Sequence, residues 1–354
     1  MENVFYGGFP QVRLRRLRRT AYLRDLVCEH TLRAHDLIWP IFIKDHSSHY
    51  HEITSMPGVY HCGLKELLNA CEQACQLGIR AIALFPVISP EKKCLMAREA
   101  YYPDSLVPRF VAQIKQRFPD LCVIGDVALD PYTSHGHDGL LAENGAVLND
   151  DTVRVLCEQA SVLAGAGVDV VAPSDMMDGR VAAIRQSLDQ KGFTHTIIMS
   201  YAAKYASSLY QPFRVAIGSS LGVNSQTKKT HHQASKNPLP LCKKTYQLSP
   251  DRLQEALREV AFDLKEGADL VLIKPATLYA DIIKTVSQTF HVPTFAYHVS
   301  GEYAMIKAGV ARGVFIERDV VSEILLSLKR AGAQGIFTYY APVVAGWLQD
   351  GHER

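Results

Sequence analysis

The segment DLVLIKP (269–275) is a short and almost entirely apolar run that ends in a lysine and a proline. Runs of the same kind recur seven more times along the chain: LIWPIFI (37–43), RAIALFPV (80–87), LCVIGDVALD (121–130), DVVAPSD (169–175), TIIMSYA (196–202), TFAYHVS (294–300) and GIFTYYA (335–341). Because these runs are mostly apolar and do not alternate strictly, they are typical of strands in a parallel sheet that helices cover.

Helical patterns lie between these runs. LKELLNACEQACQLG (64–78), DRLQEALREVAFDLKEGAD (251–269) and VSEILLSLKRAGAQG (321–335) have apolar residues at helical spacing and a glycine at or near the end. Eight alternations of strand and helix favour an α/β fold of the TIM (β/α)8 barrel type over a doubly wound sheet.

The composition is that of an ordinary globular protein. The chain has 354 residues, of which 47% are hydrophobic and 21% charged, and its formal net charge of +2 gives no general reason to expect a nucleic-acid partner. Its eight cysteines form no C-x-x-C pair, the N-terminus has no apolar leader, and no apolar run reaches membrane-spanning length. We therefore expect a cytoplasmic protein without a membrane partner.

Two lysines follow apolar runs closely, Lys204 in MSYAAKYAS and Lys274 in LVLIKPAT. Burial and a second ammonium group nearby both lower the pKa of a lysine, and a neutral amine can form a Schiff base with a ketone or aldehyde. A salt bridge or a phosphate contact is the ordinary alternative for a single lysine of this kind. Two such lysines favour carbonyl chemistry, either that of a Schiff-base aldolase or that of a dehydratase that condenses carbonyl compounds.

Other polar residues follow the same runs, among them Asp126, Asp130, Ser300 and Tyr339. Catalytic residues of a TIM barrel lie at the C-terminal ends of its strands. The predicted fold therefore gathers these groups and the two lysines on one face.

Several motifs, in one order, resemble the δ-aminolevulinic acid dehydratase (porphobilinogen synthase) family: DVALDPYTSHGHDG (126–139), VVAPSDMMDGR (170–180), MSYAAKYASSLYQPFR (199–214), LVLIKP (270–275) and YHVSGEYAM (297–305). The similarity runs from about Arg13 to the C-terminus. It implies an extended N-terminal arm, here residues 1–30, and a TIM-barrel catalytic domain, here residues 31–354. A lid over the active site is implied at about 211–246. It also implies the condensation of two molecules of 5-aminolevulinate to porphobilinogen with loss of two waters.

The resemblance also implies roles for individual residues. Lys204 and Lys274 match the two Schiff-base lysines, with Lys274 favoured for the essential imine. Arg214 and Lys243 match a cationic pair for one substrate carboxylate, and a guanidinium group can grip a carboxylate through two hydrogen bonds. Ser300 and Tyr339 match the hydroxyl donors for the other carboxylate, although hydrogen bonding at a strand end is an equal reading of the sequence alone.

The segment DVALDPYTSHGHDG bears on the metal requirement. Where zinc-dependent members of the family have three cysteines, this chain has Ala128, Asp130 and Asp138, which resembles the aspartate-type, zinc-independent branch. With Asp126, the two aspartates are expected to line the active site, where they orient the substrate amine and waters or assist proton transfer. We expect no active-site zinc, and we expect His135 and His137 in this segment to make hydrogen bonds within the loop.

Magnesium is the metal that the resemblance does imply, at a separate allosteric site. Glu259, in LREVAFDLKEG, matches the protein ligand. Oxygen ligands suit Mg²⁺, which keeps several waters and is held through one or two carboxylates.

Two segments depart from the family pattern. KPATLYAD (274–281) has Ala276 and Leu278 where a glycine and a proline are usual, and either change can disturb the backbone beside Lys274. The segment 218–244 is longer than usual and rich in polar residues, including His231 and His232, which we expect at a solvated loop tip.

The arm contains RLRRLRR (13–19), and the resemblance implies that this arm wraps a neighbouring subunit in a homo-octamer. Nucleic-acid binding or a transit peptide would also explain the composition, although leucines among the arginines fit packing on protein better than a solvated nucleic-acid arm. Two alternatives to the active dehydratase stay open at this point. One is a Schiff-base aldolase on another carbonyl substrate. The other is a catalytically impaired homologue that acts as a binding or assembly partner, which the change at KPATLYAD favours and the retained lysines oppose.

Overall fold

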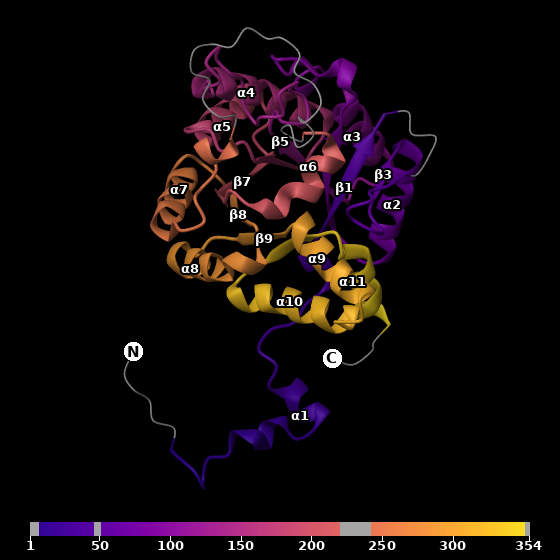
Figure 1. The fold of residues 1–354 in the computed structure, drawn as a ribbon, viewed down its shortest axis with the longest axis vertical. Coiled ribbons are helices and arrows are strands. Elements are labelled where there is room, and N and C mark those ends of the chain that lie inside the picture. Colours follow the sequence, from indigo (N-terminus) through magenta and orange to yellow (C-terminus); the bar gives the residue numbers. More distant parts are fainter. Residues whose placement is uncertain (1–6, 46–50, 220–241, 351–354) are drawn as a thin grey trace.

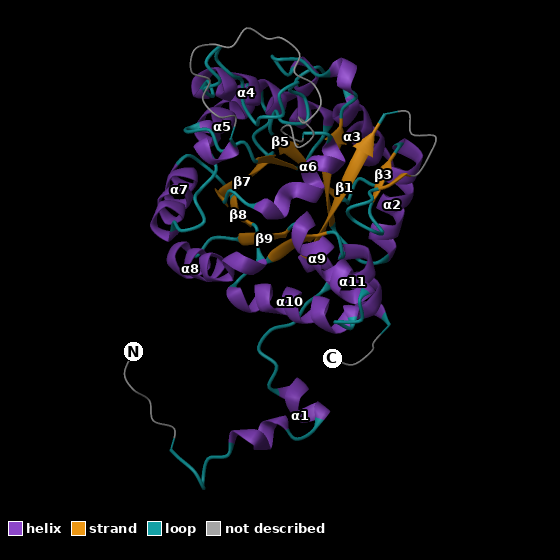
Figure 2. Ribbon diagram, viewed as in Figure 1, coloured by secondary structure: helices purple, strands orange, loops and turns teal. Residues whose placement is uncertain are grey.

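The computed structural model describes residues 7–45, 51–219 and 242–350. Eight parallel strands close into a barrel, because the first of them pairs with both the second and the last. Figure 2 shows these strands at the centre with helices around them. The TIM barrel expected from the apolar runs is confirmed. Its strands are β1 (Leu37–Lys44), β4 (Ala81–Val87), β5 (Cys122–Val127), β6 (Val170–Pro173), β7 (Ile197–Lys204), β8 (Leu270–Lys274), β9 (Thr294–His298) and β10 (Gly335–Thr338).

The strands are buried because helices cover the outside of the barrel and side chains fill its interior. β6 and β10 are buried at every position, which explains why their sequences do not alternate. The strand ends differ from the apolar runs by a few residues. β5 stops at Val127, so that Asp130 lies in the following loop, and β7 continues to Lys204.

The main helices of the barrel are α2 (Leu64–Gln76), α3 (Leu106–Arg117), α4 (Asn149–Ala166), α5 (Arg180–Gln190), α6 (Gln211–Ile217), α7 (Leu253–Lys265), α8 (Ala280–Phe290), α9 (Ser300–Ala311), α10 (Glu317–Ala331) and α11 (Ala341–Gln349). Each buries one face; in α2 this face is formed by Leu67, Cys71 and Ala74, at helical spacing. In the part of the chain that the structure describes, no helix is both long and apolar enough to cross a membrane.

Short elements complete the fold. A two-stranded addition, β2 (His51–Glu52) and β3 (Tyr60–Cys62), extends the sheet beyond β1. Single 3₁₀ turns lie at Leu14–Arg18 (η1), Ala34–Asp36 (η2), Pro90–Lys92 (η3), Arg98–Ala100 (η4), Ser208–Tyr210 (η5), Lys243–Thr245 (η6) and Thr277–Tyr279 (η7). The predicted lid therefore contains α6 and η6, whereas its residues 220–241, with His231 and His232, lie outside the described residues.

The N-terminal segment projects away from the barrel (Figure 1). It carries η1 and the helix α1 (Ala21–Leu26), which contact each other. Its large apolar side chains are exposed, including Phe9, Leu14, Tyr22 and Leu26. An exposed row of such side chains on an extended segment indicates an interaction surface.

Candidate active site

The two lysines singled out in the sequence end neighbouring strands. Lys204 is the last residue of β7 and Lys274 the last residue of β8, and the two are register partners in the sheet. Both side chains are buried. Parallel pairing thus places two amines side by side at the C-terminal end of the barrel, where catalytic groups of this fold lie.

Lys274 lies among aromatic rings. Its Nζ is 4.6 Å from the ring centroid of Tyr297 and 5.2 Å from those of Tyr201, Tyr210 and Phe213. Within the described residues, Nζ has no hydrogen-bonding or ion-pair partner. Burial, followed by the charge of Lys204, lowers the pKa of the Lys274 amine to about 7, so a large share of it is neutral near pH 7.

Lys204 has different surroundings. Its Nζ donates to Asp138 Oδ1 at 2.9 Å and to the carbonyl oxygen of Ser174. Lys204 is thus held by an anion and a carbonyl oxygen, whereas Lys274 lies among rings. The two lysines are therefore chemically distinct, a difference that the sequence does not reveal.

Asp138 is the centre of the polar network around Lys204. Its second carboxylate oxygen accepts from Lys243 Nζ at 2.7 Å and from the Tyr246 hydroxyl at 2.8 Å. Burial acts to raise the pKa of Asp138, but the charges of Lys204 and Lys243 outweigh it and hold the pKa well below its usual range. Asp138 is therefore an anion that binds two ammonium groups.

The other two aspartates differ from Asp138 and from each other. Asp130 Oδ2 accepts from Lys243 at 3.1 Å. Asp126 lies near the end of β5, where its Oδ1 is buried and has no hydrogen-bonding partner among the described residues. Burial and the negative charge of Asp130 raise the pKa of Asp126 to about 7, against the charges of Lys274 and Lys204. Asp126 is thus suited to exchange protons near neutral pH.

The predicted cationic pair comes together in the structure. Arg214 lies on α6 and Lys243 on η6, and the Arg214 charge acts to lower the pKa of Lys243. The charges of Asp130 and Asp138 outweigh burial and raise the pKa of Lys243 above its ordinary value. Because Lys243 is already paired with these aspartates, a substrate carboxylate must share it with them.

The predicted hydroxyl donors, Ser300 and Tyr339, lie on α9 and directly after β10. Ser300 begins α9, where its Oγ accepts from the Phe213 N–H at 3.0 Å and is 3.2 Å from the Leu209 carbonyl oxygen, to which it donates. Tyr339 follows β10, and its hydroxyl is 3.2 Å from that of Tyr297. Both hydroxyls therefore have protein partners that a substrate carboxylate would replace or join.

The histidine rings of the segment 126–139 make one hydrogen bond within the loop, as expected, and one to a residue outside it. The His137 N–H donates to His135 Nδ1 at 3.1 Å, and His137 Nδ1 is 3.1 Å from the Tyr246 hydroxyl. Burial, His137 and Lys243 lower the pKa of His135 to about 4, so it is neutral at pH 7. Among the described residues, no group of three or more His, Cys, Asp and Glu side chains is arranged to hold a metal ion.

The backbone beside Lys274 accommodates the unusual residues of KPATLYAD. Ala276 has φ −99°, which is normal for an L-residue, and its side chain is buried in the core. Leu278 is 69% exposed on the surface. The expected disturbance from a Cβ at position 276 therefore does not arise from a forbidden φ angle.

Several groups of the site were not found by sequence reasoning. The ring cage around Lys274 comes from Tyr201, Tyr210, Phe213 and Tyr297, and the partner of Asp138 is Tyr246. The only available signal was their presence within or beside the quoted motifs. Because aromatic residues are also ordinary core residues, that signal was weak.

Glu259 lies on α7. It lines a cavity of about 500 Å³ together with Asn149, Asp178, Arg252 and others. Burial is the main cause that raises the pKa of Glu259, and the charges of Asp263 and Asp178 add to it. In the described part of the chain, no donor pairs with this carboxylate, so it is available to a cation.

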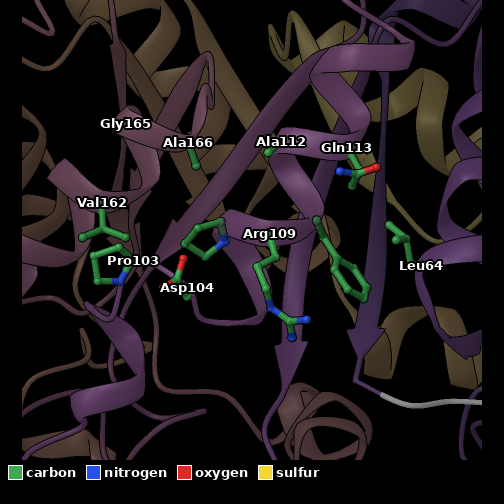
Figure 3. A pocket seen from close by; sticks show the side chains of 11 residues that line it. Leu64, Pro103, Asp104, Arg109, Ala112, Gln113, Val162, Gly165 and Ala166 are labelled. Carbon is green, nitrogen blue, oxygen red and sulfur yellow. The ribbon is translucent and has the colours of Figure 1, made fainter.

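Cavity size does not identify the site. A cavity of about 710 Å³ is lined by residues of α2, α3, α4 and the loop before α3. Figure 3 shows the side chains that line it. Arg109 and Asp104 are among its polar side chains. Neither lysine lines it, so the candidate active site rests on the chemistry at the strand ends.

Comparisons with known proteins agree with this geometry. The family model described as delta-aminolevulinic acid dehydratase matches residues 11–347. The chain is 48% identical to the delta-aminolevulinic acid dehydratase of Bradyrhizobium diazoefficiens, over 96% of this chain and 91% of the relative, and 44% identical to that of Chlamydia pneumoniae, over 96% and 97%. It is similar to the crystal structure of the Toxoplasma gondii enzyme in complex with its product porphobilinogen (TM-score 0.89, 45% identity, 96% of this chain and 92% of that one).

Proposed function

Because the chain belongs to the delta-aminolevulinic acid dehydratase family, we propose that Lys274 is the residue on which it forms its essential imine. The protein is a hydro-lyase, a porphobilinogen synthase of porphyrin biosynthesis. It condenses two molecules of 5-aminolevulinate to porphobilinogen, and two waters are lost. The observation that carries the assignment of Lys274 is its amine, which lies among four rings with a pKa of about 7.

The first chemical step follows from this amine. Neutral Nζ attacks the ketone carbon of one 5-aminolevulinate, and a C–N bond forms while the ketone oxygen takes up a proton. The nitrogen then loses both of its protons in turn, the oxygen takes up a second proton, and the C–O bond breaks as this oxygen departs as water, which leaves the imine. Asp126 can supply or accept these protons, because its pKa is also about 7.

Lys204 is proposed to hold the second substrate through its ketone. Its ammonium group must leave Asp138 and lose a proton before it can attack a carbonyl, whereas Lys274 has no such partner among the described residues. We therefore expect Lys274 to react first. Holding both substrates on adjacent strand ends makes the condensation effectively intramolecular.

The two substrate carboxylates are proposed to bind to two different pairs of residues. Arg214 and Lys243 lie near enough for the Arg214 charge to act on Lys243, and a carboxylate between them would gain charge-assisted hydrogen bonds. Ser300 and Tyr339 supply the hydroxyl groups of the other pair. This division assigns the cationic pair to the substrate on Lys204 and the hydroxyl pair to the substrate on Lys274.

We propose the aspartate-type, zinc-independent branch for this protein. Ala128 offers no metal ligand, and Asp130 and Asp138 bind the Lys243 ammonium group. The carboxylates of this segment thus serve as partners for amines. Addition of a zinc-selective chelator should leave the activity unchanged, and strong inhibition would contradict this assignment.

Magnesium is proposed to bind at Glu259 as an allosteric activator. The supporting observation is a carboxylate that lines a polar cavity and has no donor within the described residues. Because no cluster of three ligands lies there in the part of the chain described, water would supply most of the coordination shell. Glu259→Ala should abolish stimulation by magnesium and retain basal turnover, and stimulation that persists would place the metal elsewhere.

The homo-octamer and the cytoplasmic location stay proposals. The exposed apolar side chains of the arm support contact with another copy of the chain. The formal net charge of +2 offers no general reason to expect nucleic acid as the partner.

The direct test is porphobilinogen formation from 5-aminolevulinate by the purified protein, with and without magnesium. Borohydride reduction in the presence of substrate should attach substrate mass to Lys274. Lys274→Ala should abolish both turnover and this label, while Lys284→Ala, on the exposed side of α8, should change neither. Unchanged turnover in Lys274→Ala would refute the assignment of the essential imine.

A further inference from the structure

We propose that Glu302 is a positioning residue that sets the placement of Lys274 relative to Ser300. The proposal rests on the proposed function, in which these two residues hold the ketone and the carboxylate of the same substrate. Glu302 lies in the first turn of α9 and is 3% exposed. It does not itself contact the reacting atoms.

The carboxylate of Glu302 accepts two backbone hydrogen bonds. Oε2 accepts from the Val299 N–H at 2.6 Å, and Oε1 accepts from the Thr277 N–H at 2.7 Å. Val299 directly precedes Ser300, and Thr277 is three residues beyond Lys274. One buried carboxylate thus joins the segment that follows β8 to the segment that follows β9.

This connection begins where the sheet ends. The paired register of β8 and β9 finishes at Ile273 and Ala296, so backbone pairing no longer relates the two chains beyond these residues. Lys274 and Ser300 both lie past that point. The Glu302 carboxylate supplies the next connection between the two segments, through charge-assisted hydrogen bonds that are shorter and stronger than neutral ones.

An ordinary helix-capping role does not account for both bonds. A glutamate at the third position of a helix commonly accepts from the N–H of the residue before the helix, as Glu302 does from Val299. The bond from Thr277 belongs to a different element, η7. In the described part of the chain, no ion pair involves Glu302, so two backbone donors and the N-terminus of α9 stabilise its charge.

The consequence for catalysis is geometric. An imine on Lys274 and a carboxylate on Ser300 belong to one small substrate, so the distance between the two anchors must match its length. A displacement of about 1 Å in such a site can reduce the rate roughly 100-fold. Loosening the segment after Lys274 should therefore reduce kcat and raise KM together.

Glu302→Gln tests the proposal, since it retains one acceptor oxygen and presents an NH₂ group to the other backbone N–H. We expect a folded protein whose kcat/KM falls at least tenfold and whose borohydride trapping at Lys274 slows. Amide hydrogen exchange should also become faster in a peptide that covers residues 276–280. Glu66→Gln is the matched control, because Glu66 occupies the same third position in α2, an element that does not follow either lysine-bearing strand. It should change none of these quantities.

The outcomes separate this proposal from the proposed function. Faster exchange with kinetic constants within twofold of the parent would reduce Glu302 to a structural cap and overturn the positioning role. Slower catalysis without faster exchange at 276–280 would overturn it as well. If the parent protein forms no porphobilinogen, the proposed function fails, while the exchange measurement still tests the contact. If Glu302→Gln does not fold, Glu302→Asp, which retains the charge but reaches less far, takes its place under the same criteria.

Discussion

Lys274 shows how much one residue's surroundings determine its chemistry. Its Nζ lies over the rings of four aromatic residues, while Lys204, one strand away, is paired with Asp138. The same residue type thus has a lowered pKa among rings at one strand end and an anionic partner at the next. Local burial and charge, and not residue identity, separate these two environments.

The first prediction concerns the pH dependence of imine formation. Because the pKa of Lys274 is about 7, its trapping rate by borohydride should rise roughly tenfold between pH 6 and pH 8 as the neutral amine accumulates. The negative charge of Asp126 acts to raise this pKa. Asp126→Asn should therefore shift the rise to lower pH. Asp120→Asn, an exposed substitution, should leave the profile in place, and a profile that Asp126→Asn does not move would contradict the coupling.

The second prediction concerns stability. Folding lowers the pKa of Lys274 from 10.5 to about 7. Between these two pH values the unfolded chain therefore binds more protons than the folded chain, so the stability of the fold rises with pH. The free-energy cost of burying this amine is greatest below about pH 7. Lys274→Met should remove this cost. We therefore expect it to raise the free energy of unfolding by about one to several kcal/mol at pH 7. The gain over the parent should shrink as the pH rises towards 10.5.

Chemical denaturation at pH 7 and pH 9 measures this difference directly. Lys284→Met, a change at an exposed position of α8, serves as the control and should have little effect at either pH. A Lys274→Met protein that is less stable than the parent at pH 7 would show that ring contacts of the ammonium group outweigh its desolvation.

The strands and helices of the barrel could be predicted from the sequence where each one leaves a local pattern of apolar residues. All eight apolar runs became strands of one closed sheet, and α2, α7 and α10 lie within a few residues of the segments with helical spacing. The predicted strands are wrong at their C-terminal ends. β5 stops before Ala128, and β7 continues to Lys204 through a register shift between Ser200 and Ala203. Such irregularities depend on neighbouring strands and leave no local signal.

The site itself was predictable only in its residue types. Lysines and aspartates at strand ends could be identified because the barrel places these ends together. Their pairing could not, since Lys243 and Asp138 are far apart in sequence and meet only through η6 and the loop after β5. The same holds for the backbone donors of Glu302, because hydrogen bonds to the main chain leave no trace in residue identity.

The third prediction concerns α6, the element that carries Arg214. Lys93 Nζ donates to the carbonyl oxygens of Ile217 at 3.3 Å and Gly218 at 2.9 Å, so it caps the C-terminal end of this helix. Lys93→Met should loosen α6, raise the KM for 5-aminolevulinate several-fold and speed amide exchange in residues 211–219. Lys92→Met is the matched control, because Lys92 neighbours Lys93 in the sequence but its ammonium group pairs with Asp45 and Glu99.

An unchanged KM in Lys93→Met, with unchanged exchange in α6, would show that the capping contacts do not hold Arg214. A change in exchange alone would separate helix order from substrate binding. Lys92 and Lys93 are adjacent in the sequence, and among the described residues it is Lys93 that contacts the end of α6.

At the scale of the whole molecule, the arm and the barrel differ in how they treat their large apolar side chains. The barrel buries its apolar runs, whereas the arm exposes Phe9, Leu14, Tyr22 and Leu26 and projects away from it (Figure 1). Exposing such side chains to water is unfavourable, and covering them with another copy of the chain removes that cost. The proposed assembly through the arm would remove this cost.

The last prediction follows from this contrast. Removing residues 1–30 should yield a smaller particle by light scattering, while the barrel retains its circular dichroism spectrum. Leu14→Glu combined with Leu17→Glu should have a similar effect, because the apolar contacts are lost. Arg15→Ala combined with Arg16→Ala should retain the parent's mass, since these arginines would matter most if the arm bound nucleic acid. A truncated protein with the mass of the parent would show that the barrel alone directs assembly, and the exposed side chains of the arm would then need a different partner.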